Sequence, residues 1–211
     1  MDILLRSMLF GGKAVVTAID CTETTEKARK IHGLSKSATN ALARVLAMGV
    51  FMSAGFKGLK HKLTLIIDGD GAGGNIIVCG DCGSKVRCRM DNPDCFAGED
   101  IRPVREVIGG DGRLTVIKDF RLKEPYNGSV KLVNGSVDAD FAYYFTTSEQ
   151  LPSAIATGVR LNEDGSVKAA GAVIVQPMPG CPSEIVETLA DVVRNFKDMD
   201  DIVEKHTPST L

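Results

Sequence analysis

Residues 63–90 read LTLIIDGDGAGGNIIVCGDCGSKVRCRM, and this stretch decides the fold class of the chain. Short runs rich in Ile, Leu and Val alternate in it with clusters of Gly, Asp and Ser, which is the pattern of strands joined by turns. The pattern predicts strands at 63–68, 75–79 and 84–90. Because the connections are short, neighbouring strands should form antiparallel hairpins.

Further strands flank this stretch, and helices precede it. A strand at 13–19 leads into two helices, and the later strands are predicted at 114–119, 129–133, 158–161 and 167–176. Residues 138–150 fit either a strand or a short helix, and their acidic start favours the helix. Since strands and helices segregate along the chain, the fold class is α+β. We expect antiparallel sheets packed with a buried central helix.

The two upstream helices differ in polarity. Asp20 followed by Glu23 resembles a capping box, and the polar helix that it opens should end at Gly33. A serine can cap the second helix, which is apolar on almost every side from residue 41 to residue 54. A helix without a polar face must be covered on most sides, so this one is the expected central helix.

The composition argues against several classes of function. Of the 211 residues, 44% are hydrophobic and 25% are charged, which is ordinary for a globular fold. The formal charge is only -2, so no nucleic-acid partner is expected. The apolar segment 41–56 carries Arg44 and is shorter than the roughly 20 residues that a membrane span needs. We therefore expect no membrane partner.

The N-terminus and the cysteine count indicate a reducing compartment. Asp2 and Arg6 interrupt the first apolar stretch, which is unlike the basic and apolar regions of an export signal. Six cysteines in a chain of 211 residues are too few for a disulfide scaffold. We expect a cytoplasmic protein whose cysteines are thiols or metal ligands.

A change of pattern at Pro177-Met178-Pro179-Gly180 marks the predicted domain boundary, because no strand signal follows it. It divides the chain into a globular core, residues 1–178, and a helical segment, residues 179–211. The helical segment carries a continuous apolar stripe at helical spacing: Ile185, Val186, Leu189, Val192, Val193 and Phe196. Met199, Ile202 and Val203 repeat the stripe in a second, shorter helix.

A helix with such an apolar stripe must pack against another surface. Two interpretations of the stripe meet this requirement. The commoner one is a C-terminal helix that completes the core. The other is a detachable cover, whose apolar face or the surface beneath it binds a partner after release. Thr207-Pro208 has the pattern of a further helix start, so we expect the chain to be a fragment that stops within a helical segment.

The cysteines offer an alternative function. Cys79 and Cys82 form a CxxC motif at a predicted hairpin turn, where two thiolates can grip zinc. The second pair would have to be Cys88 and Cys95, whose spacing is poor for a zinc knuckle. A zinc-binding or thiol-redox module centred on Cys79 and Cys82 is therefore an alternative, weakened further because thioredoxin-type motifs begin helices instead of lying between strands.

No pattern in the chain predicts an enzyme. The glycine run at 68–74 returns into a strand, whereas phosphate-binding loops lead into a helix, so we interpret it as a flexible hairpin loop. The histidines at 32, 61 and 206 lack neighbouring carboxylates and are interpreted as polar surface residues. Neither a nucleophile-base pair nor a catalytic motif can be named.

Several blocks in sequence order resemble the redox-regulated thirty-three-kilodalton heat-shock chaperones, and the similarity extends from Met1 to the end of the chain. The blocks include Ile31-His32-Gly33, Asp111-Gly112-Arg113-Leu114-Thr115-Val116, Asp140-Phe141-Ala142-Tyr143-Tyr144-Phe145, Ser148-Glu149-Gln150-Leu151-Pro152-Ser153 and Gln176-Pro177-Met178-Pro179-Gly180. The resemblance implies an ATP-independent holdase that binds unfolding proteins under oxidative stress. It also implies a core that tends to form homodimers.

In this family the core and a helical linker precede a small zinc domain, which oxidation unfolds so that apolar surface becomes available. The present chain departs from the pattern, because it stops at Leu211 before any four-cysteine zinc domain. We therefore expect zinc in the full-length protein only and no metal ligand within residues 1–211. The stripe from Ile185 to Phe196 matches the first linker helix and is the expected linker-docking or client-binding face.

Overall fold

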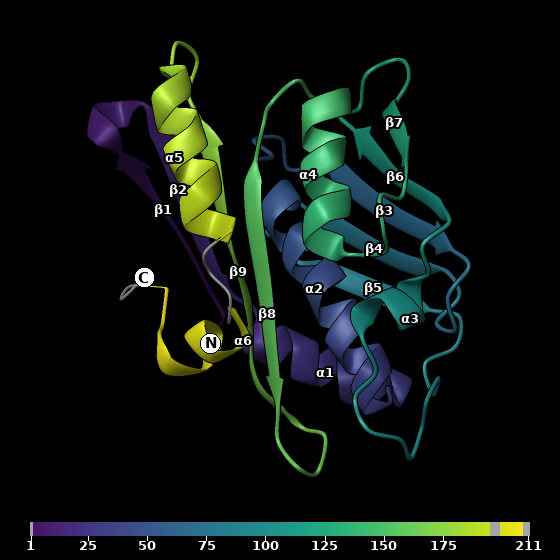
Figure 1. Ribbon diagram of the computed structural model, residues 1–211. Coiled ribbons are helices and arrows are strands. Elements are labelled where there is room, and N and C mark those ends of the chain that lie inside the picture. Colours follow the sequence, from purple (N-terminus) through teal and green to yellow (C-terminus); the bar gives the residue numbers. More distant parts are fainter. Residues whose placement is uncertain (1, 195–198, 209–211) are drawn as a thin grey trace.

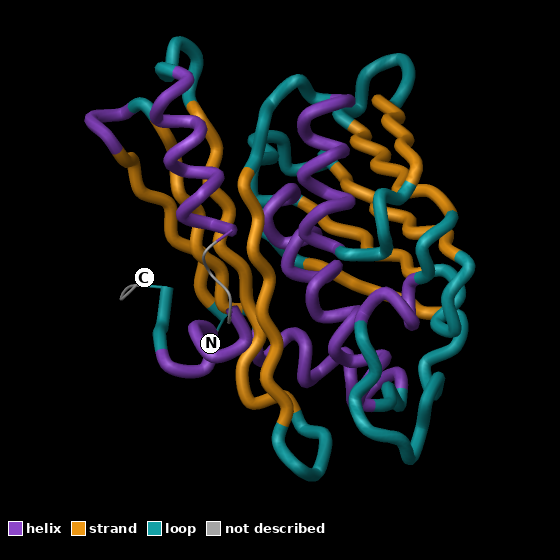
Figure 2. Tube along the Cα trace, in the orientation of Figure 1, coloured by secondary structure: helices purple, strands orange, loops and turns teal. Residues whose placement is uncertain are grey.

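The computed structural model describes residues 2–194 and 199–208, apart from the side chains at 190 and 192–194. Nine strands in these residues form two antiparallel sheets (Figures 1 and 2). The first sheet has the order β1 (Ile3–Leu9), β2 (Ala14–Asp20), β9 (Val167–Pro177), β8 (Ala154–Leu161). The second has the order β5 (Val86–Met90), β4 (Ile76–Asp81), β3 (Lys62–Gly69), β6 (Gly112–Asp119), β7 (Tyr126–Lys131). The α+β class and the antiparallel pairing are thus confirmed.

Helix α2 (Lys36–Ser53) lies between the two sheets, as Figure 1 shows, and forms the centre of the core. The Ser35 side chain accepts a hydrogen bond from the Ala38 amide and caps the helix. Leu42, Leu46 and Met48 are each at most 1% exposed. The predicted buried central helix is therefore confirmed, and helix α4 (Val137–Ser148) confirms the helical interpretation of residues 138–150.

Helix α1 (Thr22–His32) differs from its prediction at the start. The residue before its first turn is Cys21, whose side chain makes no capping bond. The Asp20 carboxylate accepts the Thr22 amide at 3.0 Å, so Asp20 contributes to the cap one residue earlier than the predicted capping box requires. The next two amides of the first turn, at Glu23 and Thr24, donate to the carboxylate of Asp2. Strand β1 brings Asp2 to the helix, and this strand was absent from the prediction.

The β3–β4 loop joins two antiparallel strands, as predicted, but its glycines pack against another part of the chain. Helix α3 (Val104–Ile108) lies against it, and backbone amides of Gly71 and Gly73 donate to the carbonyls of Ile108 and Val107. A Cβ atom at Gly71 would overlap the backbone of α3. The glycines are therefore needed for close packing of one backbone against another.

Helices α5 (Ser183–Arg194) and α6 (Met199–Lys205) follow β9, and we call them the tail helices. Figure 1 shows α5 on the side of the four-stranded sheet that faces away from α2 and α4. The first sheet is thus covered on one face by the central core and on the other by the tail helices. No helix in the described residues is long and apolar enough to span a membrane.

Candidate functional site: the tail-covered face of the four-stranded sheet

The face of the four-stranded sheet that points away from α2 is built from small apolar side chains. Cross-strand partners share a face, so the registers Ser7↔Val16↔Val175 and Leu5↔Ala18↔Val173 define rows across this surface. We call this surface the outer face, and it comprises Leu5, Leu9, Ala14, Val16, Ala18, Ala154, Ala156, Gly158, Gly171, Val173 and Val175.

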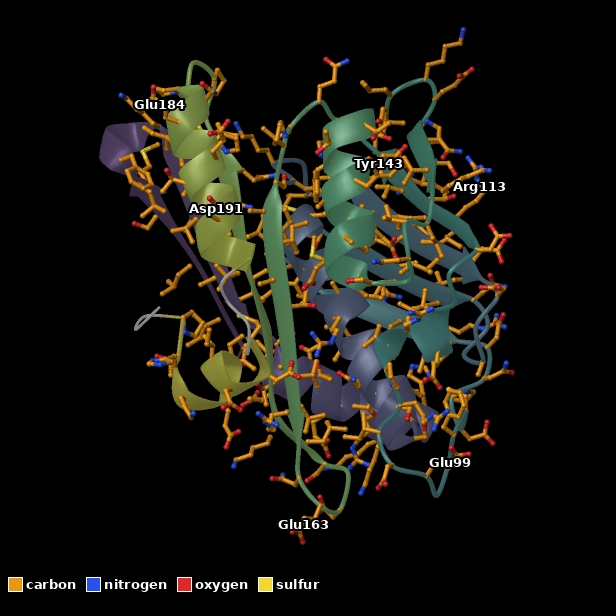
Figure 3. The ribbon with its side chains drawn as sticks, viewed as in Figure 1. Glu99, Arg113, Tyr143, Glu163, Glu184 and Asp191 are labelled. Atoms are coloured by element: carbon orange, nitrogen blue, oxygen red, sulfur yellow. The ribbon has the colours of Figure 1, made fainter. Side chains whose placement is uncertain are left out.

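Helix α5 packs one side of its predicted stripe against the outer face. Leu189 is only 5% exposed, and Ile185 packs against the same apolar cluster as Val173 and Val175. Glu184 and Asp191 are exposed on α5 (Figure 3), as the amphipathic pattern predicts. Val186 and Leu189 also line a cavity of about 430 Å³ between α5, β8 and α4.

Part of the predicted stripe lies beyond what the structure describes. Val192 and Val193 belong to α5, but their side chains are outside the description. Phe196 lies outside the described residues altogether. The docking of Ile185 and Leu189 is therefore what the structure shows of this predicted face.

Helix α6 docks where the outer face has no side chains. Gly158 on β8 and Gly171 on β9 are cross-strand partners. A Cβ atom at Gly158 would fall far inside contact distance of the Met199 carbonyl oxygen, whereas one at Gly171 would overlap the Ile19 carbonyl oxygen of β2 and only touch Val203 at 3.4 Å. Gly158 therefore leaves a depression that admits the backbone of α6, and Met199 is buried there at 6% exposure.

Arg44 fastens α6 to the central helix. Its guanidinium extends from α2 to the edge of β8, donating to the Thr157 carbonyl and, at 2.6 Å, to Asp200 on α6. The same Asp200 oxygen accepts the Val159 amide at 2.9 Å. Sequence reasoning treated Arg44 only as an interruption of an apolar helix. A charge in such a helix needs a partner, and that was the signal for this contact.

Two further cations of the sheet meet the acidic side of α6. Arg160 pairs with Asp201 and, at 3.1 Å, with Glu204, and Lys168 also pairs with Glu204. These side chains are partly exposed, so each pair contributes little by itself. Because opposite charges line both surfaces, they orient α6 on the sheet more than they stabilise the fold.

The carboxyl of Asp138 lies beside this contact, at the start of α4. It accepts hydrogen bonds from the Thr157 amide at 3.1 Å and from the Thr157 hydroxyl at 2.6 Å. Burial raises the pKa of Asp138, whereas the bonds from Thr157 and the charge of Arg44 oppose the rise. Asp138 and Asp200 thus accept hydrogen bonds from the Thr157 and Val159 amides at the edge of β8. These bonds leave the two edge amides unavailable for pairing with another strand.

The four cysteines of the alternative zinc site do not come together. Cys79 pairs with Arg87, and Cys88 pairs with Val78, a fully buried core residue, so Cys79 and Cys88 project from opposite faces of the sheet. The Cys82 thiol donates to the Phe56 carbonyl oxygen, and burial raises the pKa of Cys88 to about 11. These residues do not fit a tetrahedral zinc site, which requires four convergent thiolates.

Among the other chemistry-bearing residues, His61 differs from its prediction as a polar surface residue. Its ring lies edge-on to the rings of Phe56 and Phe120, with centroid distances of 5.7 Å and 5.2 Å. Within the described residues, no group of three or more His, Cys, Asp or Glu side chains is arranged to hold a metal ion. The tail-covered outer face therefore remains the strongest candidate site.

Comparison with known proteins agrees with the fold. Residues 2–211 match the model of the family described as Hsp33 protein. The 33 kDa chaperonins of Thermoanaerobacter sp. (strain X514) and Staphylococcus epidermidis (strain ATCC 12228 / FDA PCI 1200) are 36% and 34% identical over 207 residues, covering 97% of this chain and 70% of each relative. The crystal structure of the Thermotoga maritima 33 kDa chaperonin aligns with a TM-score of 0.85 at 30% identity, over 96% of this chain and 70% of that one. The chain belongs to the Hsp33 family of chaperones.

Proposed function

We propose that the chain is the client-binding part of an ATP-independent holdase. Unfolding polypeptides would bind the outer face of the four-stranded sheet after the tail helices leave it. The proposal rests on one observation: α5 and α6 cover a continuous apolar surface. Their contacts with this surface form a cluster of their own, separate from the main core. Unfolding proteins expose apolar segments, and burial of apolar area is not directional, so such a surface accepts many sequences.

The small side chains of the outer face suit this role. Ala14, Ala18 and Ala156 make the surface flat, and large exposed groups of a client can lie across it. Leu5, on the outer face of edge strand β1, is 43% exposed even with the tail helices docked. An extended apolar surface of this kind marks a protein-interaction site when it is uncovered.

ATP independence is supported by the structure of the glycine run at 68–74, which in sequence most resembles a phosphate-binding loop. The amides of Gly71 and Gly73 donate to α3, so they are not available to a phosphate group. The loop also returns into β4 instead of opening a helix, and it lacks the helix N-terminus that holds phosphates in nucleotide sites. We propose that this part of the chain has no catalytic role.

Redox control, a zinc site in the full-length protein, homodimer formation and a cytoplasmic location complete the proposal. They are supported by the resemblance to the redox-regulated chaperones. The cysteines at 79, 82, 88 and 95 do not fit the zinc role, so we propose no metal ligand among them. Within residues 1–211 the regulated step would be undocking of the tail helices.

A light-scattering assay with a thermally unfolding client tests the proposal. We expect a variant that lacks residues 181–211 to suppress aggregation in the absence of nucleotide, because its outer face is uncovered. The complete chain should suppress less. If the shortened chain is folded by circular dichroism and the client aggregates as fast as with no chaperone, the holdase proposal fails.

A further inference from the structure

Two leucines protrude at the end of the five-stranded sheet where β3 begins and β6 ends. Leu59 is 92% exposed and Leu122 is 75% exposed, the highest values among the large apolar side chains of the described residues. The register Lys62↔Asp119 places their two loops side by side. Single exposed leucines are common, but two on adjacent loop tips need a reason.

The loops that carry these leucines are bound to each other. The Arg121 guanidinium donates to the Lys60 carbonyl oxygen at 2.9 Å. The Phe120 ring packs edge-on against the rings of Phe56 and His61, with centroid distances of 5.6 Å and 5.2 Å. These contacts fix the two loops relative to each other, so the structure holds Leu59 and Leu122 exposed side by side.

Basic side chains surround the two leucines. The exposed cations of these loops and of the neighbouring β4–β5 turn are Lys57, Lys60, Lys62, Lys85, Arg121 and Lys123. The acidic side chains in the same loops are Asp81, Asp119 and Glu124, and Asp119 is paired with Arg121 at 3.4 Å. This end is therefore net positive in a chain of net charge -2. We call it the basic leucine end.

We propose that the basic leucine end makes peripheral contact with a bilayer rich in anionic lipid. Leu59 and Leu122 would enter the boundary between headgroups and acyl chains, while the surrounding lysines meet the lipid phosphates. Both leucines project from loop tips instead of lining a groove, which suits a soft planar surface better than a peptide. The expectation of no membrane partner rested on the lack of a spanning segment, and that does not bear on peripheral contact.

Tryptophan substitution provides the test, because the chain contains no tryptophan. Leu59→Trp and Leu122→Trp each place one reporter at the basic leucine end. Ile31→Trp is the matched control, since Ile31 is 66% exposed and lies before α2, whereas Leu59 follows it. On addition of vesicles of phosphatidylcholine and phosphatidylglycerol, the emission of the first two should shift to the blue and that of the control should not. An unchanged emission at both leucine positions, or an equal shift at Ile31, overturns the proposal.

Co-sedimentation with the same vesicles separates lipid insertion from simple charge attraction. The double substitution Leu59→Ser with Leu122→Ser should weaken binding by about tenfold or more, because apolar burial is lost. Ile31→Ser should bind as the unchanged chain does. If the double variant binds vesicles equally well, or if heparin competes fully for binding, the site is a general polyanion site and the lipid proposal is wrong.

Discussion

Gly158 decides at the level of a single residue whether α6 can dock. It faces Gly171 across β8 and β9, and its missing side chain leaves the depression that the Met199 backbone occupies. No conformational argument is needed for Gly158, because the requirement is one of space. A sequence pattern does not reveal this requirement, since the atoms that need the space belong to Met199, about 40 positions away.

The space requirement at Gly158 gives a direct prediction. Gly158→Ala should displace α6, because the new methyl group would overlap the Met199 carbonyl oxygen. Limited proteolysis should then cut the tail helices faster than in the unchanged chain. Gly110→Ala is the control, because a Cβ atom there meets no atom within 4 Å. Equal cleavage of both variants would show that α6 does not depend on the depression.

Glu26 supplies a pH-dependent contact between α1 and the β8–β9 hairpin. Hydrogen bonds from Arg29 chiefly, and from the Val167 amide, lower the pKa of Glu26 from 4.5 to about 2. A depressed pKa in the folded state stabilises the protein above the unfolded value, and the contribution disappears as the pH falls from about 4.5 toward 2.

Glu26→Gln should therefore lower the free energy of unfolding by about 1 kcal/mol at pH 7, after allowance for solvent screening. The difference from the unchanged chain should vanish near pH 2. Urea titrations at several pH values measure it. Glu99→Gln, at an exposed position in a loop (Figure 3), should leave the curve unchanged. A difference that persists at low pH would contradict the ionic origin.

At the scale of elements, the tail helices are the part whose docking strength matters. Leu189→Asp places a charge where the side chain is 5% exposed, which costs about 2 to 4 kcal/mol unless α5 moves away. We expect α5 to undock, with faster amide hydrogen exchange in residues 183–194. Thr188→Asp, at the exposed neighbouring position, should leave exchange unchanged. Unchanged exchange with Leu189→Asp would mean that α5 is not held by this face.

Elements with a strong apolar period were predictable from the sequence, and those defined by distant partners were not. Helix α2 is buried on almost every side, as its sequence predicts, and Ile185 and Leu189 of the predicted α5 stripe pack against the sheet. The strands from β3 onward overlap their predicted ranges, although β7 begins three residues and β8 four residues earlier than predicted. Strand β1, ILLRSML, lacks a two-residue period because much of it is exposed at a sheet edge. Helix α3 has five residues, too few to show a period.

The candidate site was predictable only on its helical side. The apolar stripe of α5 predicted a docking face. The surface on which it docks is formed by β1, β2, β8 and β9, which are distant in sequence. The ion pairs of Arg44, Arg160 and Lys168 with α6 depend on that assembly. Acidic residues in α6 were visible in the sequence, whereas nothing indicated which cations they would meet.

For the whole molecule, the contacts divide into two clusters with different roles. The large cluster joins both sheets through α2, and the small one joins the outer face to the tail helices. Removal of the tail helices should therefore leave the large cluster intact. The basic leucine end belongs to the five-stranded sheet, so membrane contact and client binding would use different sheets.

Site-specific photo-crosslinking tests most directly whether clients bind the outer face. A photoreactive residue would replace Val16, on the outer face of β2, or Thr115, which projects from β6 opposite the buried core. Both are half-buried, β-branched strand residues. In the chain without residues 181–211, mixed with a thermally unfolding client, position 16 should crosslink strongly and position 115 weakly. Equal yields, or crosslinking from position 115 alone, would contradict client binding on the four-stranded sheet.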